Sequence, residues 1–189
     1  MLLATGCPKR GGGGPPQHYE DPKAMIAVFE EPERDAWQLP DRVVRALPFP
    51  SKSAVVADIG AGSGYFTRRL AAEVPDGRVY AVDVDGEFED YLLEHREAWG
   101  TPNIQPHLAI YDDPMLPSGE IDLVFTANTY AVIRDRVGYF GKVRTALSAE
   151  GRLAIIDFRP DASPPGNIAP APEYRIGRET AIDELQKAG

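Results

Sequence analysis

The stretch Asp58-Ile59-Gly60-Ala61-Gly62-Ser63-Gly64 decides the fold of this chain. Its first two residues close the apolar run SAVVADI (53–59), which has the length and β-branched composition of a strand buried on both faces. Helix signals follow at 65–74. Glycines between a strand and a helix allow a tight turn and the close approach of a ligand. The stretch therefore predicts a strand, a ligand-binding loop and a helix in that order.

Downstream of this loop, strand and helix signals alternate. The expected elements are strands at 78–83, 103–109, 121–127 and 151–158, and helices at 87–99 and 134–148. Pro106 weakens the strand at 103–109 and favours an edge position for it. Strands separated by helices of about 10 to 15 residues form βαβ units. We therefore expect an α/β fold with a doubly wound, Rossmann-like and mostly parallel sheet.

The remaining segments complete the expected organisation. Residues 1–17 hold four consecutive glycines and two prolines, a composition that predicts a disordered tail. Residues 18–189 are expected to form one domain. Its parts are cap helices within 21–50, a core at 53–158, a proline-rich loop at 159–178 and a last helix at 179–188.

Composition excludes several classes of function. With a formal net charge of −9, the chain is a poor candidate for nucleic-acid binding, which depends on basic groups. Cys7 is the single cysteine, and His18, His95 and His107 lack metal-ligand spacing, so no metal site is expected. No apolar stretch approaches the ~18 residues of a membrane span. A small-molecule partner is expected.

The first residues bear on localisation. Leu3 to Cys7 faintly resembles the end of a bacterial lipoprotein signal. The apolar run before it is shorter than the ~7 to 15 residues such a signal needs. We therefore expect a cytoplasmic protein, or an exported lipoprotein if the true start lies upstream of Met1.

The glycine spacing distinguishes between cofactors. The dinucleotide fingerprint G-x-G-x-x-G fails, because its last glycine would fall on Tyr65 or Thr67. The spacing that fits is D-x-G-x-G-x-G, beginning at Asp58. A second acid, Asp83, ends the strand at 78–83, where a carboxylate accepts hydrogen bonds from two ribose hydroxyls.

With these motifs the chain resembles the class I S-adenosylmethionine-dependent methyltransferases. Within that superfamily it is similar to the small bacterial stand-alone enzymes of the ubiquinone/menaquinone type (methyltransferase type 11). Further matching stretches are ERDAWQ (33–38), GYF (64–66), VYAVD (79–83), DDP (112–114), IDLV (121–124) and GRLAIIDF (151–158). The resemblance implies methyl transfer from S-adenosylmethionine to a small-molecule acceptor.

The resemblance also implies the cofactor-binding residues, which are Asp58, Ile59, Gly60, Ala61, Gly62, Gly64, Tyr65, Asp83, Val84 and Asn128. In this assignment the glycines pass under the methionine part and Asp58 helps to hold its ammonium. Asp83 takes the ribose hydroxyls and Val84 packs against adenine. Asn128 lies beside the sulfonium.

The acceptor side is less determined. Candidate acceptor-binding residues are Trp37, Gln38, Tyr130, Asp157 and Tyr174. Trp37 fits equally well as an anchor of its helix. Related chains commonly carry a histidine pair just after Thr129 and Tyr130, and a histidine where Tyr174 stands, so no general base is assigned. Two alternatives stay open: a catalytically silent cofactor-binding module and, disfavoured by the glycine spacing, an NAD-linked oxidoreductase.

The end of the chain adds one expectation. The resemblance implies an antiparallel pair of strands after the last helix, but the chain stops at Gly189. We expect a sheet truncated to five strands, with the strand at 151–158 as an uncovered edge that invites association. The oligomeric state stays open.

Overall fold

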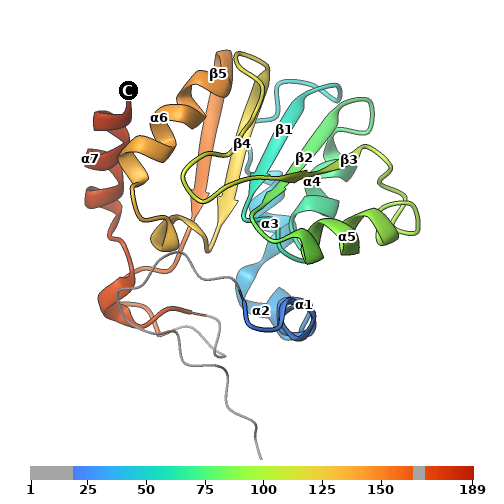
Figure 1. Cartoon of the computed structure of the whole chain (residues 1–189), viewed down its shortest axis with the longest axis horizontal. Helices are drawn as coiled ribbons and strands as arrows, with labels where there is room; N and C mark the ends of the chain where they lie inside the picture. The colour runs from blue at the N-terminus through green and yellow to red at the C-terminus, as the bar shows by residue number, and fades with distance from the viewer. Residues whose placement is uncertain (1–18, 164–168) are drawn as a thin grey trace, which may run out of the picture.

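The central sheet has five strands in the order β3-β2-β1-β4-β5, and each pair of neighbours is parallel. The computed structural model describes residues 19–163 and 169–189 (Figure 1). The strands are β1 (Val55–Ile59), β2 (Arg78–Asp83), β3 (Ile104–Leu108), β4 (Ile121–Ala127) and β5 (Leu147–Ile156). The strand order reverses between β1 and β4, which is where an open α/β sheet binds its ligand.

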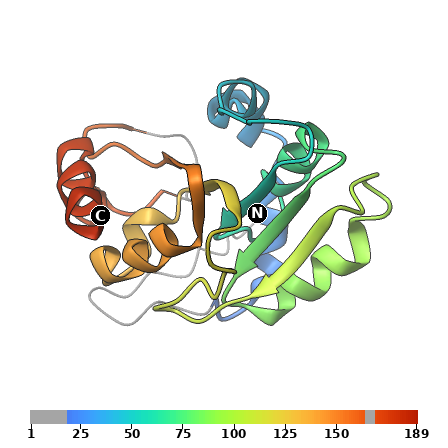
Figure 2. The ribbon, with the colours of Figure 1, turned by 90° about the horizontal axis from the view of Figure 1, so that it is seen from above.

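Helices cover both faces of the sheet. The helices are α1 (Pro22–Phe29), α2 (Arg34–Gln38), α3 (Pro40–Arg45), α4 (Thr67–Glu73), α5 (Gly86–His95), α6 (Arg136–Ala146) and α7 (Arg178–Ala188), with short 3₁₀ turns η1 (Tyr130–Val132) and η2 (Pro172–Tyr174). Leu70 of α4 and Leu92 of α5 pack into one core cluster with Val56. Phe140 of α6 and Leu185 of α7 pack into the other. Figures 1 and 2 show α6 and α7 side by side near β5.

The predicted α/β fold is confirmed. Strands β2 and β4 have the predicted bounds, β3 is an edge strand, and β5 forms the other edge of a five-stranded sheet. The predicted tail (1–17), with Cys7, and also His18 lie outside the described residues. No helix of the described part of the chain is long and apolar enough to cross a lipid bilayer.

Two elements differ from the prediction. Strand β5 begins at Leu147 rather than Gly151, because Leu147 pairs with Ile121 before an irregularity in the register moves the next pair to Leu123 and Arg152. Helix α2 lies within the predicted cap, but its bounds were not predicted, because its five residues are too few for a periodic pattern. It ends at Leu39, whose φ of 49° turns the chain directly into α3.

Candidate functional site

The glycine loop joins β1 to α4 at the carboxyl edge of the sheet. Gly60, Gly62 and Gly64 all have positive φ, at 78°, 53° and 80°. A Cβ atom on Gly60 would lie 2.1 Å from Oγ1 of Thr129, and one on Gly62 would lie 3.2 Å from the Phe29 ring. The sequence predicts these glycines for a tight turn and for the close approach of a ligand. The positive φ values agree with the tight turn, and the packing of Thr129 and Phe29 against Gly60 and Gly62 adds a second requirement for glycine.

Asp58 lies in β1 immediately before this loop and is 3% exposed. Its Oδ2 accepts a hydrogen bond of 2.6 Å from the hydroxyl of Thr67. Burial, together with the nearby Asp83 carboxylate, raises the pKa of Asp58 to about 7. Within residues 19–163 and 169–189, no Lys or Arg makes an ion pair with Asp58. Asp58 is therefore a buried acid without a bound cation.

Asp83 ends β2 and lies against the glycine loop. Its Oδ2 accepts from the backbone N–H of Gly62 at 2.8 Å, and its Oδ1 accepts from those of Val84 at 2.8 Å and Asp85 at 3.3 Å. Burial raises the pKa of Asp83, although these amides oppose the shift. The amides fix the carboxylate in one orientation beside the loop. Oδ2, which accepts one hydrogen bond, retains capacity for a further donor.

Asn128 and helix α2 meet at the carboxyl end of β4. Asn128 has a left-handed backbone (φ 60°), and its side-chain amide donates to Oε1 of Gln38 at 2.9 Å. The neighbouring Trp37 lies 5.8 Å from Phe158, measured between ring centroids. The structure therefore brings three predicted residues together, Trp37 and Gln38 from the cap and Asn128 from the sheet.

Tyr130 lies away from this group. It is 1% exposed, and its hydroxyl donates to Glu184 of α7 at 2.8 Å. Arg136 binds both carboxylate oxygens of the same Glu184 at 2.7 Å. The Tyr130 hydroxyl is therefore committed to the packing of α7, which differs from the acceptor-binding role that the resemblance implies.

The other two acceptor candidates differ in their surroundings. Asp157 follows β5 and accepts from the backbone N–H groups of Ala131 and Phe158, at 3.1 and 2.7 Å. It thereby links the segments after β4 and β5. Tyr174 lies in η2 and is 47% exposed.

The two described histidines contact backbone carbonyls, His95 that of Tyr91 and His107 that of Pro114. The described part of the chain holds no cluster of residues that could bind a metal ion.

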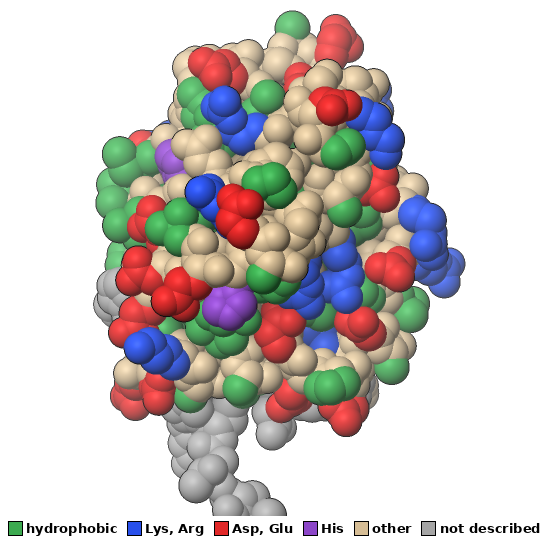
Figure 3. Space-filling model, turned by 90° about the vertical axis from the view of Figure 1, so that its right-hand side faces the viewer, with side chains coloured by type: hydrophobic (Ala, Val, Ile, Leu, Met, Phe, Trp, Pro, Cys, Tyr) green, Lys and Arg blue, Asp and Glu red, His purple; other side chains and the backbone are tan. Residues whose placement is uncertain are grey.

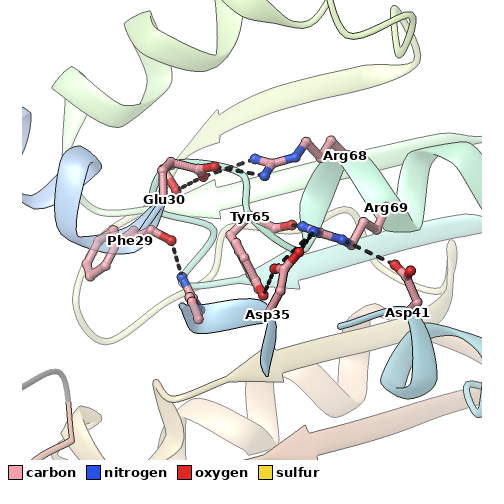
Figure 4. Close-up of polar contacts among 9 residues, drawn as sticks. Phe29, Glu30, Asp35, Asp41, Tyr65, Arg68 and Arg69 are labelled. Carbon is pink, nitrogen blue, oxygen red and sulfur yellow. Dashed lines mark hydrogen bonds and ion pairs between the residues drawn. The ribbon is translucent and has the colours of Figure 1, made fainter. Parts of the chain in front are cut away.

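A polar network that the sequence did not reveal ties the cap helices to the glycine loop (Figure 4). Glu30, the C-cap of α1, accepts from the Ser63 hydroxyl at 2.6 Å and from both terminal nitrogens of Arg68 at 2.8 and 3.0 Å. Arg69 binds Asp35 of α2 at 3.2 Å. These contacts join residues that are about thirty positions apart, which no local pattern reports.

Comparisons with known proteins agree with this geometry. A protein family described as "Methyltransferase domain" matches residues 56–151. Among curated proteins, the malonyl-[acyl-carrier protein] O-methyltransferase of Acetivibrio thermocellus is 28% identical over 113 residues, which are 59% of this chain and 38% of that protein. The chain spans only about a third of the length of the curated relatives it matches.

Solved structures extend the similarity beyond the matched segment. A SAM-dependent methyltransferase from Aquifex aeolicus superimposes with a TM-score of 0.80 at 25% identity, covering 89% of this chain and 88% of that chain. A phosphoethanolamine N-methyltransferase of Haemonchus contortus, solved with S-adenosylhomocysteine, shares the fold at 17% identity and a TM-score of 0.66, covering 81% of this chain and 37% of that one.

Proposed function

The chain belongs to the methyltransferase domain family, and on this basis we propose that it transfers a methyl group from S-adenosylmethionine to a small-molecule acceptor. One observation carries the choice of cofactor. Asp58 is a buried acid and Asp83 a partly buried one, both beside the glycine loop, and desolvation raises the pKa of both. A buried carboxylate is costly unless a cation compensates it. S-adenosylmethionine brings two cationic groups, an ammonium and a sulfonium.

The same observation disfavours an NAD-linked oxidoreductase. A dinucleotide places a doubly negative pyrophosphate against the loop that follows the first strand. An acid at the end of the second strand suits the ribose of either cofactor. Here, however, the buried Asp58 also comes immediately before the loop, and Asp83 already accepts a hydrogen bond from the backbone N–H of Gly62. Carboxylates and a pyrophosphate that lie close together in a buried site repel each other strongly.

When bound, the cofactor would supply a methyl group on a cationic sulfur. The sulfur would keep the electron pair of the broken S–C bond, and a lone pair of the acceptor would form the new bond to the methyl carbon. The protein's task in such an in-line transfer is to orient both partners and exclude water. The buried Gln38 side chain fixes the Asn128 amide beside the expected position of the sulfonium. Trp37 and Phe158 add an aromatic wall next to it. This wall favours an acceptor with an apolar body.

A nucleic-acid acceptor is disfavoured by charge. The formal net charge is −9. Figure 3 shows one face of the molecule, on which acidic side chains are interspersed with basic ones. A phosphate backbone requires a continuous basic surface.

Binding and turnover test the proposal separately. Calorimetry should detect binding of S-adenosylmethionine and of S-adenosylhomocysteine. The Asp83→Asn substitution should weaken the affinity for both by about 10- to 100-fold, because hydrogen bonds to a charged group are lost. Asp76→Asn, at an exposed acid in the turn before β2, is the matched control and should leave binding unchanged. A product assay with labelled cofactor over phenols, quinols, amines and thiols should then find an acceptor.

Three outcomes separate the hypotheses. Binding with turnover supports the methyltransferase. Binding without turnover on every acceptor class supports the silent module. No binding to the wild-type protein, or an Asp83→Asn variant that binds as well as the Asp76→Asn control, refutes the cofactor assignment.

A further inference from the structure

Arg34 is a buried arginine whose hydrogen-bonding capacity the chain leaves partly unused. It begins α2 and is 8% exposed. Its Nη1 donates to the carbonyl of Phe29 at 2.9 Å, and its guanidinium carbon lies 3.7 Å from the centre of the Tyr65 ring. Its Nε is buried and has no hydrogen-bond partner among the described residues. A guanidinium carries five N–H donors, so this one retains donors for a ligand.

Three other arginines with partly buried side chains each bind a carboxylate, whereas the partly buried Arg175 binds backbone carbonyls. Arg68 pairs with Glu30 and Arg69 with Asp35, as Figure 4 shows, and Arg136 pairs with Glu184 on α7. All three are more exposed than Arg34. Yet no carboxylate within 19–163 or 169–189 makes an ion pair with Arg34. Arg34, the most buried of these arginines, therefore has no anion as a partner among the described residues, and burial lowers its pKa.

The contacts of Arg34 place it beside the glycine loop. Tyr65, whose ring it covers, directly follows Gly64, and Phe29, whose carbonyl it binds, packs against Gly62. Asp58 lies in β1, two residues before Gly60 of the same loop. Asp58 and Arg34 are close enough for each charge to affect the pKa of the other, but they form no ion pair.

This arrangement is complementary to one chemical group. The amino-acid end of S-adenosylmethionine carries an ammonium and a carboxylate on the same carbon. An unpaired buried acid and an unpaired buried base at the same loop match these two charges. A carboxylate is also the anion whose geometry a guanidinium binds best, through two parallel N–H donors.

We propose that Arg34 binds the carboxylate at the amino-acid end of the cofactor and makes the site selective for ligands that carry it. The inference rests on the proposed function and deepens it. Arg34 is then a specificity-determining residue supplied by the cap, and α2 contributes to both sides of the site, with Arg34 toward the cofactor and Gln38 toward Asn128.

Three ligands test this by calorimetry. S-adenosylmethionine has both charged groups of the amino-acid end, decarboxylated S-adenosylmethionine lacks only the carboxylate, and 5′-methylthioadenosine lacks both. The wild-type protein should bind S-adenosylmethionine about 10- to 100-fold more tightly than the decarboxylated form, as expected for hydrogen bonds to a charged group. Arg34→Gln should lose this preference, so that its affinities for the two forms become equal.

Arg69→Gln is the matched control. Arg69 also lies over the Tyr65 ring, with its guanidinium carbon 4.5 Å from the centre, but it already has Asp35 as a partner. Loss of Arg69 weakens the cap and should lower affinity for both ligands equally, so their ratio stays that of the wild type. The ratio is therefore a readout that a purely structural arginine does not change.

The outcomes distinguish the inference from the proposed function. If Arg34→Gln keeps the wild-type ratio of affinities for S-adenosylmethionine and its decarboxylated form, the role of Arg34 is refuted and the methyltransferase assignment stands. If Arg34→Gln does not fold, the wild-type affinities alone test the inference. Equal wild-type affinity for S-adenosylmethionine and its decarboxylated form refutes it. If the wild type binds neither S-adenosylmethionine nor 5′-methylthioadenosine, the proposed function fails and the inference fails with it.

Discussion

Asp58 should make cofactor binding depend on pH. Burial and the neighbouring Asp83 raise its pKa to about 7, while the Thr67 hydroxyl and Arg34 oppose the shift. Below pH 7 the free protein therefore holds Asp58 protonated and neutral. An ammonium bound there stabilises the ionised form, so binding must release the proton. Affinity should fall as the pH falls.

The magnitude follows from the shift. If the pKa of Asp58 is about 7 in the free protein and well below 5 in the complex, the dissociation constant rises almost tenfold for each pH unit below 7. Between pH 7 and pH 5 the loss is roughly 50-fold, or about 2 kcal/mol of binding free energy.

The same shift has a consequence for stability, with the opposite dependence on pH. Because the native pKa of Asp58 lies above its ordinary value of 3.8, folding favours the protonated form. That contribution is complete below about pH 4 and is lost as the pH rises through about 7, where the ionised acid costs about 4 kcal/mol. Asp58→Asn removes the charge and keeps an acceptor for Thr67. It should therefore be more stable than the wild type at pH 8 and similar at pH 4.

Calorimetric titrations with S-adenosylhomocysteine from pH 5 to pH 7 measure the binding effect, and buffers of different ionisation enthalpy count the protons released. Asp58→Asn should flatten the profile to what Asp83, whose pKa is also raised, contributes. The exposed-acid variant Asp76→Asn should retain the wild-type slope. A flat wild-type profile, an unchanged slope in Asp58→Asn, or lower stability of Asp58→Asn at pH 8 would refute the reasoning.

Two further predictions concern stability. Gly60→Ala places a Cβ 2.1 Å from Oγ1 of Thr129 at positive φ and should cost about 3 kcal/mol or more in urea unfolding, whereas Gly119→Ala, at a φ of 73° in open space, should cost only about 1. Equal costs would show that the contact with Thr129 yields without strain. Glu184→Gln weakens an ion pair with α6 whose side chains are each 17% exposed, and should cost about 1 to 3 kcal/mol. Asp183→Asn, in a pair 60% exposed or more, should cost less than about 0.5 kcal/mol, and similar melting temperatures for the two variants would contradict the role given to Glu184.

Local patterns predicted the elements of this fold because the strands are apolar, short and bounded by turns. The alternation also gave the doubly wound order, with Pro106 correctly marking β3 as an edge. The start of β5 escaped prediction, since pairing of Leu147 with Ile121 is a property of the neighbouring strand and not of the sequence around Leu147. The candidate site likewise has a part that local sequence predicts and a part that it does not. The loop and Asp83 follow from strand ends, whereas the contacts of Glu30 and Arg34 depend on how the cap packs.

The directions of the pKa shifts separate two kinds of buried charge in this molecule. In a formed ion pair the pKa of the acid falls and that of the base rises, and Glu184 and Arg136 show this. At the glycine loop both shifts are reversed, because the pKa of Asp58 is raised and that of Arg34 is lowered. The folded chain therefore pairs Arg136 with Glu184 at α7, but it leaves Asp58 and Arg34 at the loop without an ion pair. These two buried charges lower the stability of the folded protein. A ligand that carries both opposite charges relieves both costs at once, so the amino-acid end of the cofactor should contribute more to stabilising the folded protein than its neutral adenine.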